Sequence, residues 1–109
     1  MKKVCIVGLG YIGLPTAVIL ATKGYKVTGA DINNEIVKKI NQGITHINEP
    51  ELKEKLNKVI KNLDLKAQTK PIFSDVFIIA VPTPYIVGEN GIHSPDTSLL
   101  FNAIRSICP

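Results

Sequence analysis

The feature that most constrains the fold lies at the start of the chain, in the stretch VCIVGLGYIGLPTAVILATKG at residues 4–24. Its first four residues form an apolar run with two valines and an isoleucine, which predicts a strand buried on both faces. Three glycines follow at once with the spacing G-x-G-x-x-G, at Gly8, Gly10 and Gly13. Apolar residues then recur at helical spacing. A strand, a glycine loop and a helix in this order are typical of a dinucleotide-binding turn.

Two other interpretations of this stretch are a secretory signal and a membrane helix. It follows two lysines and carries no charge until Lys23. The glycines and Pro15 interrupt it where either segment needs a continuous helix, and no cleavage site follows. We therefore expect a cytoplasmic protein that does not contact the membrane.

Each glycine of the motif has a separate physical role. The first allows the tight turn, the second lets a pyrophosphate approach the backbone, and the third lets helix and strand pack closely. We expect the helix to begin near Tyr11 and to end at Gly24, so that Pro15 falls in its first turn, where its missing N–H costs nothing. Its N-terminus then presents N–H groups and a partial positive charge to the phosphates.

The rest of the chain alternates strands with helices. Beyond the opening unit we expect a strand at 25–30, a helix capped by Asn33 or Asn34, and a helix capped by Asn48. Strands at 63–69 and 76–81 should follow, then a long loop at 82–93 and a last helix starting at Ser94-Pro95-Asp96. This order predicts an α/β, Rossmann-like doubly wound parallel sheet with strand order 3-2-1-4, truncated after about four strands. Its fourth strand would be an apolar edge, which favours self-association.

Asp31 stands at the end of the second predicted strand, where a carboxylate accepts hydrogen bonds from the adenosine ribose hydroxyls. It would repel a 2′-phosphate, and no arginine follows, so the sequence favours NAD over NADP. The alternative is that Asp31 caps the next helix. Thr83 lies between two prolines after the fourth strand, at the topological switch point. We expect its hydroxyl to meet the cofactor; a rigid turn without ligand contact is the alternative.

Composition excludes several other classes. The 109 residues suit one domain, with 45% hydrophobic residues for a core and a net charge of +4. Lysines clustered between residues 53 and 70 alternate with acids and lack arginines and aromatics, so we expect a solvated face and no nucleic acid. Cys5 reads as a buried hydrophobe, and Cys108 lies at the other end. His46 and His93 read as loop residues, and no spacing predicts a metal site.

The segments GLGYIGLP, GADIN, INQGITHINEPEL and FIIAVPTP together resemble the N-terminal part of the UDP-glucose/GDP-mannose dehydrogenase family. The resemblance covers essentially the whole chain and implies an NAD-dependent oxidoreductase that converts the C6 alcohol of a nucleotide sugar to a carboxylate in two steps. The resemblance also implies that Tyr11, Ile12, Asp31 and Thr83 contact the cofactor, the first two through their backbone N–H groups. The segments HINEPEL and VPTP resemble the members that act on UDP-N-acetyl-D-mannosamine or the neighbouring ones that act on UDP-N-acetylglucosamine. The resemblance implies the first of these sugars as the substrate, with UDP-N-acetylglucosamine and UDP-glucose as alternatives.

The family's catalytic cysteine, lysine and asparagine and its sugar-binding domain have no counterpart in residues 1–109. We therefore expect an incomplete NAD-binding domain, without catalytic residues and inactive alone. The resemblance implies that its parent is a homo-oligomer of polysaccharide biosynthesis that meets the sugar only at full length. Two further alternatives stay open: a nucleotide-sensing Rossmann module that is not an enzyme, and a dehydrogenase for a hydroxyacyl thioester.

Overall fold

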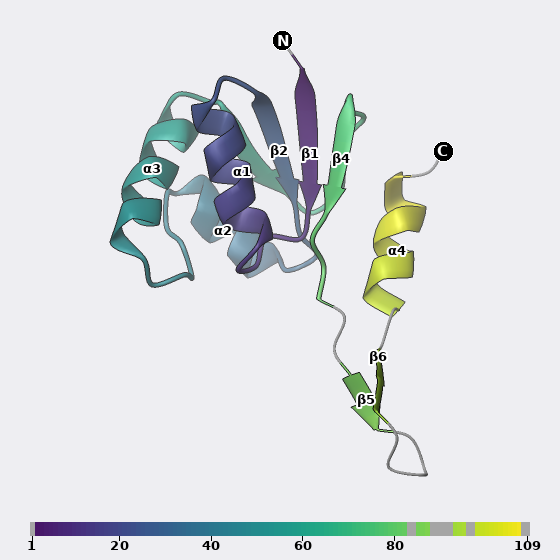
Figure 1. Ribbon diagram of the computed structural model, residues 1–109. Coiled ribbons are helices and arrows are strands. Elements are labelled where there is room, and N and C mark those ends of the chain that lie inside the picture. Colours follow the sequence, from purple (N-terminus) through teal and green to yellow (C-terminus); the bar gives the residue numbers. More distant parts are fainter. Residues whose placement is uncertain (1, 83–84, 88–92, 96–97, 108–109) are drawn as a thin grey trace.

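The computed structural model describes residues 2–82, 85–87, 93–95 and 98–107. Figure 1 shows the elements, which are β1 (Lys3–Val7), α1 (Gly13–Thr22), β2 (Lys26–Ala30), α2 (Asn34–Asn41), α3 (Pro50–Lys61), β3 (Leu65–Gln68), β4 (Val76–Ile79), β5 (Tyr85–Val87), β6 (His93–Pro95) and α4 (Ser98–Ile107). The predicted α/β class is confirmed.

The main sheet has four parallel strands in the order β3-β2-β1-β4, which confirms the predicted order. Val4 of β1 pairs with Val27 of β2 on one side and with Val76 of β4 on the other. All four carboxyl ends therefore lie at one end of the sheet, the lower end in Figure 1. From β1 the chain continues to β2 on one side, and β4 later pairs with β1 on its other side. The carboxyl end of the sheet beside β1 is therefore the topological switch point.

Alternate residues of β1 face two separate cores. Val4 and Ile6 join the larger core, together with buried residues of α1, α2 and α3. Cys5 and Val7 face the other way, where Ala103 of α4 joins them. The period of two along a strand explains this division. The helices between β1 and β3 therefore cover one face of the sheet, and α4 lies on the opposite face.

Three predicted helix starts are wrong by a few residues. α1 begins at Gly13 and not near Tyr11. The N-cap of α3 is Glu49 and not Asn48, because Pro50 takes the first helical position and holds the residue before it extended. α4 begins at Ser98 and not at Ser94.

The predicted long loop contains a hairpin of β5 and β6, in which Ile86 pairs with Ser94. The segment Ser94-Pro95 is therefore extended rather than a helix start, as a residue before proline favours. His93 is the first residue of β6 and not a loop residue. On α4, Ile104 is 37% exposed.

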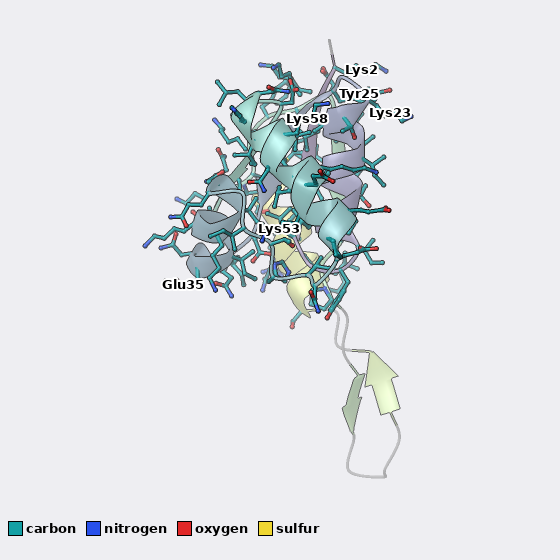
Figure 2. All side chains as sticks on the ribbon, turned by 90° about the vertical axis from the view of Figure 1, so that its left-hand side faces the viewer. Lys2, Lys23, Tyr25, Glu35, Lys53 and Lys58 are labelled. Carbon is teal, nitrogen blue, oxygen red and sulfur yellow. The ribbon has the colours of Figure 1, made fainter. Side chains whose placement is uncertain are left out.

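The lysine-rich stretch is a solvated surface, as predicted. Leu52, Leu56 and Val59 form the buried stripe of α3. Lys53 and Lys58 lie on its outer face, and Figure 2 shows both side chains pointing away from the sheet. Within the described residues, no helix has the length and apolar character needed to cross a bilayer.

Candidate functional site

A cleft of about 1070 Å³ opens at the carboxyl ends of the strands. The glycine loop after β1 forms one wall, and Asp31 and the residues that follow β2 form a second. The end of β4 and one side of α4 close it, with Thr69, Lys70 and Pro71 beyond β3. Of the predicted site residues, Gly8, Gly10, Tyr11, Ile12 and Asp31 therefore line one cleft at the switch point of the sheet, whereas Gly13 does not line it.

Gly8 is wedged between the ends of two strands. Its φ angle is +101°, a left-handed conformation that glycine adopts without strain. Its N–H donates to the carbonyl oxygen of Ala30 at 2.7 Å. A Cβ added there would lie 2.6 Å from the carbonyl oxygen of Ala80. Both the backbone conformation and the space require glycine.

Gly13 and Gly10 differ in what surrounds them. A Cβ at Gly13 would overlap the carbonyl oxygen of Gly8, so Gly13 lets α1 start close to the loop. A Cβ at Gly10 would meet no heavy atom of the chain within 4 Å. No contact within the chain therefore requires a glycine at position 10, and the space beside it is open.

The N-terminus of α1 points into this space without a cap of its own. Its N-cap residue, Ile12, makes no side-chain capping hydrogen bond, and the first turn holds no acidic residue. Tyr11 and Ile12 are 80% and 71% exposed. No acceptor in the described part of the chain takes their backbone N–H groups. Such a helix end favours an anion.

The carboxylate of Asp31 connects two loops of the cleft. Its Oδ2 accepts the N–H of Leu9 at 2.9 Å, and its Oδ1 accepts the N–H of Asn33 at 2.9 Å. The side chain of Asn33, and not that of Asp31, caps α2 by accepting from Glu35 and Ile36. The helix-cap alternative for Asp31 is therefore wrong.

Sequence reasoning missed Leu9 as part of the site. Its side chain is fully buried in the larger core. A Cβ at Gly29 of β2 would lie 2.7 Å from Leu9 Cδ2, so the missing side chain of Gly29 makes the room that Leu9 fills. A single glycine inside a strand is the sequence signal for such a close approach.

Comparison with known proteins shows which family the chain belongs to. The family model described as "UDP-glucose/GDP-mannose dehydrogenase family, NAD binding domain" matches residues 2–109. This chain belongs to that family. Its cofactor is NAD, and the two alternatives outside the family, the sensing module and the thioester dehydrogenase, are set aside.

Relatives within the family carry more specific names. The UDP-N-acetyl-D-mannosamine dehydrogenase of Campylobacter jejuni is 50% identical over 106 residues, which cover 97% of this chain and 25% of that protein. The solved UDP-N-acetyl-mannosamine dehydrogenase of Staphylococcus aureus has a TM-score of 0.89 and 45% identity, over 96% of this chain and 25% of that one. The solved GDP-mannose dehydrogenase of Pseudomonas aeruginosa has a TM-score of 0.84 and 33% identity, over 98% and 24%. The chain thus spans about a quarter of the length of these relatives.

The remaining residues singled out in the sequence are Thr83 and the two cysteines. Thr83 and Cys108 lie outside the described residues, although Val81 and Pro82 line the cleft. Cys5 is buried, and this burial raises the pKa of its thiol above the ordinary value of 9.0, against a smaller opposing effect of a backbone hydrogen bond from Ile72. A buried neutral thiol is a poor nucleophile.

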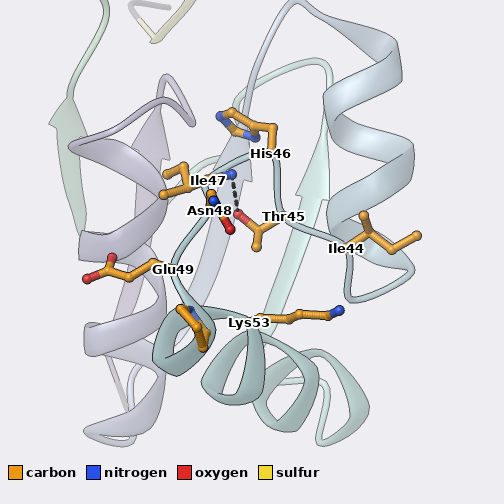
Figure 3. Close-up of a pocket in the computed structure, with 8 residues that line it drawn as sticks. Ile44, Thr45, His46, Ile47, Asn48, Glu49 and Lys53 are labelled. Carbon is orange, nitrogen blue, oxygen red and sulfur yellow. Dashed lines mark hydrogen bonds between the residues drawn. The ribbon is translucent and has the colours of Figure 1, made fainter.

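A second, smaller pocket of the domain is separate from the cleft. It measures about 460 Å³ and lies between the loop at residues 44–49 and the start of α3 (Figure 3). Inside that loop, Thr45 Oγ1 accepts the N–H of Ile47 at 2.9 Å. His46, at its rim, is exposed in the loop as predicted. None of the predicted cofactor residues lines this pocket. Among the described residues, no three His, Cys, Asp or Glu side chains gather as metal ligands would.

Proposed function

We propose that the glycine loop holds the pyrophosphate of NAD through the backbone N–H groups of Tyr11 and Ile12. The observation that carries this proposal is the open space at Gly10, beside an uncapped helix N-terminus. Gly8 and Gly13 are explained by contacts within the chain, whereas Gly10 needs a ligand to explain it. An anion there gains both the unpaired N–H groups and the helix dipole.

Asp31 is proposed to receive the adenosine ribose. Each carboxylate oxygen accepts one backbone N–H and keeps lone pairs for the ribose hydroxyls. A 2′-phosphate would meet this negative charge, so NAD is favoured over NADP. Of the described residues that line the cleft, Lys70 alone carries a positive side chain. Thr83, between two prolines, is proposed to place its hydroxyl against the cofactor.

The parent activity is proposed to be the oxidation of UDP-N-acetyl-D-mannosamine at C6, from alcohol to carboxylate, with two NAD. The choice of sugar rests on identities of 45–50% to dehydrogenases named for that sugar, against 33% to one named for GDP-mannose. NAD supplies the hydride acceptor in each step. Residues 8–13 and Asp31 bind and orient it, and orientation supplies much of such a rate.

Residues 1–109 are proposed to be the NAD-binding part of this enzyme, with the sugar-binding and catalytic groups supplied by other segments. The chain alone should then bind NAD and oxidise nothing. The parent enzyme is further proposed to be homo-oligomeric and cytoplasmic and to supply polysaccharide synthesis. The support is the relatives' length, about four times the length matched.

Calorimetric titration of the chain with NAD, NADP and ATP tests the cofactor assignment. NAD should bind more tightly than NADP, and Asp31→Ala should weaken NAD binding by about 1–3 kcal/mol, the size of a hydrogen bond to a charged group. Lys70→Ala is the control for the positive side chain in the cleft. Equal affinities for NAD and NADP in the unaltered chain would contradict the assignment.

A chimera tests the enzyme assignment. Residues 1–109 would replace the matching segment of the Campylobacter jejuni dehydrogenase, and NADH formation with UDP-N-acetyl-D-mannosamine would be followed by absorbance. We expect turnover, with a raised KM for NAD in the Asp31→Ala chimera. The matched graft into the Pseudomonas aeruginosa GDP-mannose dehydrogenase should recover less activity. A folded but inactive first chimera would count against the proposal.

A further inference from the structure

Each oxygen of the Asp31 carboxylate accepts a backbone N–H of this chain. Oδ2 accepts from Leu9, which lies 22 positions earlier in the chain, and Oδ1 accepts from Asn33. The first bond reaches the residue between Gly8 and Gly10. Asp31 therefore holds the glycine loop itself, in addition to facing the cleft.

Two more contacts fix the loop on the same side of Gly10. The Gly8 N–H donates to the carbonyl oxygen of Ala30 at 2.7 Å. The side chain of Leu9 is fully buried, in the space that Gly29 leaves over β2. All these contacts involve residues before Gly10. After it, the N–H groups of Tyr11 and Ile12 lack acceptors within the described residues. The loop thus divides into an anchored half and an open half.

We propose that Asp31 is a positioning residue for the glycine loop, so that its charge strengthens binding of a diphosphate even when the ligand lacks ribose hydroxyls. This inference rests on the proposed function of the cleft. Holding Leu9 in place orients the adjoining open N–H groups before the ligand arrives. A ligand then binds without the entropic cost of ordering the loop.

Asp31→Asn separates this role from packing. An asparagine has the same shape but offers one oxygen and one NH₂ group. The NH₂ group must face the N–H of either Leu9 or Asn33, so one of the two bonds is lost. The charge that strengthens the other bond is lost as well.

The experiment compares two ligands by amide chemical-shift titration of the ¹⁵N-labelled chain. ADP carries the ribose hydroxyls, and 2′,3′-dideoxy-ADP lacks them. Asp31→Asn should weaken binding of the dideoxy ligand about fivefold to tenfold, the size of one ordinary hydrogen bond. ADP should be weakened further, because it also loses its ribose contacts.

Asp75→Asn is the matched control. Asp75 Oδ2 also accepts a backbone N–H, from Lys3 at 2.8 Å, but at the opposite end of the sheet. Like Asp31→Asn, the Asp75→Asn substitution removes one negative charge and weakens a hydrogen bond between a carboxylate and a backbone N–H. Both ligands should bind this variant as they bind the parent. A similar loss in this control would overturn the positioning role.

Hydrogen exchange of the ligand-free parent adds a measurement that needs no variant. The Leu9 amide should exchange slowly, whereas those of Tyr11 and Ile12 should exchange fast. Fast exchange at Leu9, or an unchanged dideoxy-ADP affinity in Asp31→Asn, would overturn the positioning role. A weaker ADP affinity in the same variant would then still support the ribose contact. Absence of binding by either ligand to the parent would overturn the proposed function together with this inference.

Discussion

Helices α1 and α2 both begin at the carboxyl end of the sheet, yet their N-termini are built differently. α2 is capped within the chain, because Asn33 Oδ1 accepts the N–H groups of Glu35 and Ile36, and Glu35 adds negative charge to the first turn. α1 has neither a side-chain cap nor an acidic residue there. The two helices therefore differ in whether a side chain caps them: at α1 the Leu14 N–H donates to the carbonyl oxygen of Gly10, and the N–H groups of Tyr11 and Ile12 just before the helix have no acceptor among the described residues.

The third helix shows that a missing cap alone is not informative. α3 also lacks a side-chain capping bond, and like α1 it has a proline in its first turn, but Glu51 adds a negative charge that favours that end. α1 combines an uncapped end with the open space at Gly10 and the unpaired N–H groups beside it. This combination, and not the missing cap, is the basis of the anion site proposed at α1.

The largest effect is expected from Gly13→Ala. The new Cβ would overlap the carbonyl oxygen of Gly8, which is backbone and cannot move aside without opening the loop. We expect a loss of about 3 kcal/mol or more in the free energy of unfolding. Urea unfolding followed by circular dichroism measures it. An unchanged midpoint would show that α1 does not depend on the close contact.

The next effect is expected from Ile12→Asp, which gives α1 the charge that α2 already has. Ile12 is 71% exposed, so no packing is lost. The carboxylate should raise the free energy of unfolding by about 0.5 kcal/mol through the helix dipole, and weaken NAD binding more than about tenfold because its negative charge repels the pyrophosphate. Ile12→Asn controls for shape without charge. Unweakened NAD binding would contradict the phosphate role of this helix end.

Gly10→Ala should separate function from stability. Its Cβ meets nothing in the chain, so the free energy of unfolding should change by less than about 0.5 kcal/mol. NAD affinity should fall about tenfold, because the methyl group enters the path of the pyrophosphate. Urea unfolding and calorimetry are run on the same sample. A stable variant that binds NAD normally would remove the main observation behind the proposed site.

Asn33→Ala is expected to have the smallest effect on NAD binding. It removes the two capping bonds of α2 and should cost about 1 kcal/mol of unfolding free energy. The backbone N–H of Asn33 still reaches Asp31, so NAD affinity should change little. A loss of affinity matching that of Ile12→Asp would mean that the two helix ends do not have separate roles.

The sequence by itself determined the local units and their order. The apolar run before Gly8 predicted the first strand, and the glycine spacing predicted the loop and the helix after it. Asp31 could be placed at a strand end, and Asn33 was one of two predicted caps, because each depends on neighbours a few positions away. The strand order β3-β2-β1-β4 also followed, since right-handed crossovers leave few alternatives.

Only the tertiary structure decided how the loop is held. The bond from Leu9 to Asp31 joins residues 22 positions apart, and the burial of Leu9 over Gly29 depends on the register of β1 against β2. Sequence periodicity shows which face of a strand is apolar, but not which atom lies opposite a missing side chain. The hairpin of β5 and β6 was likewise missed, because its pairing is set by a partner strand rather than by local propensity. Local propensity acts over a few residues, whereas a binding loop takes its shape from contacts that exist only after the strands have paired.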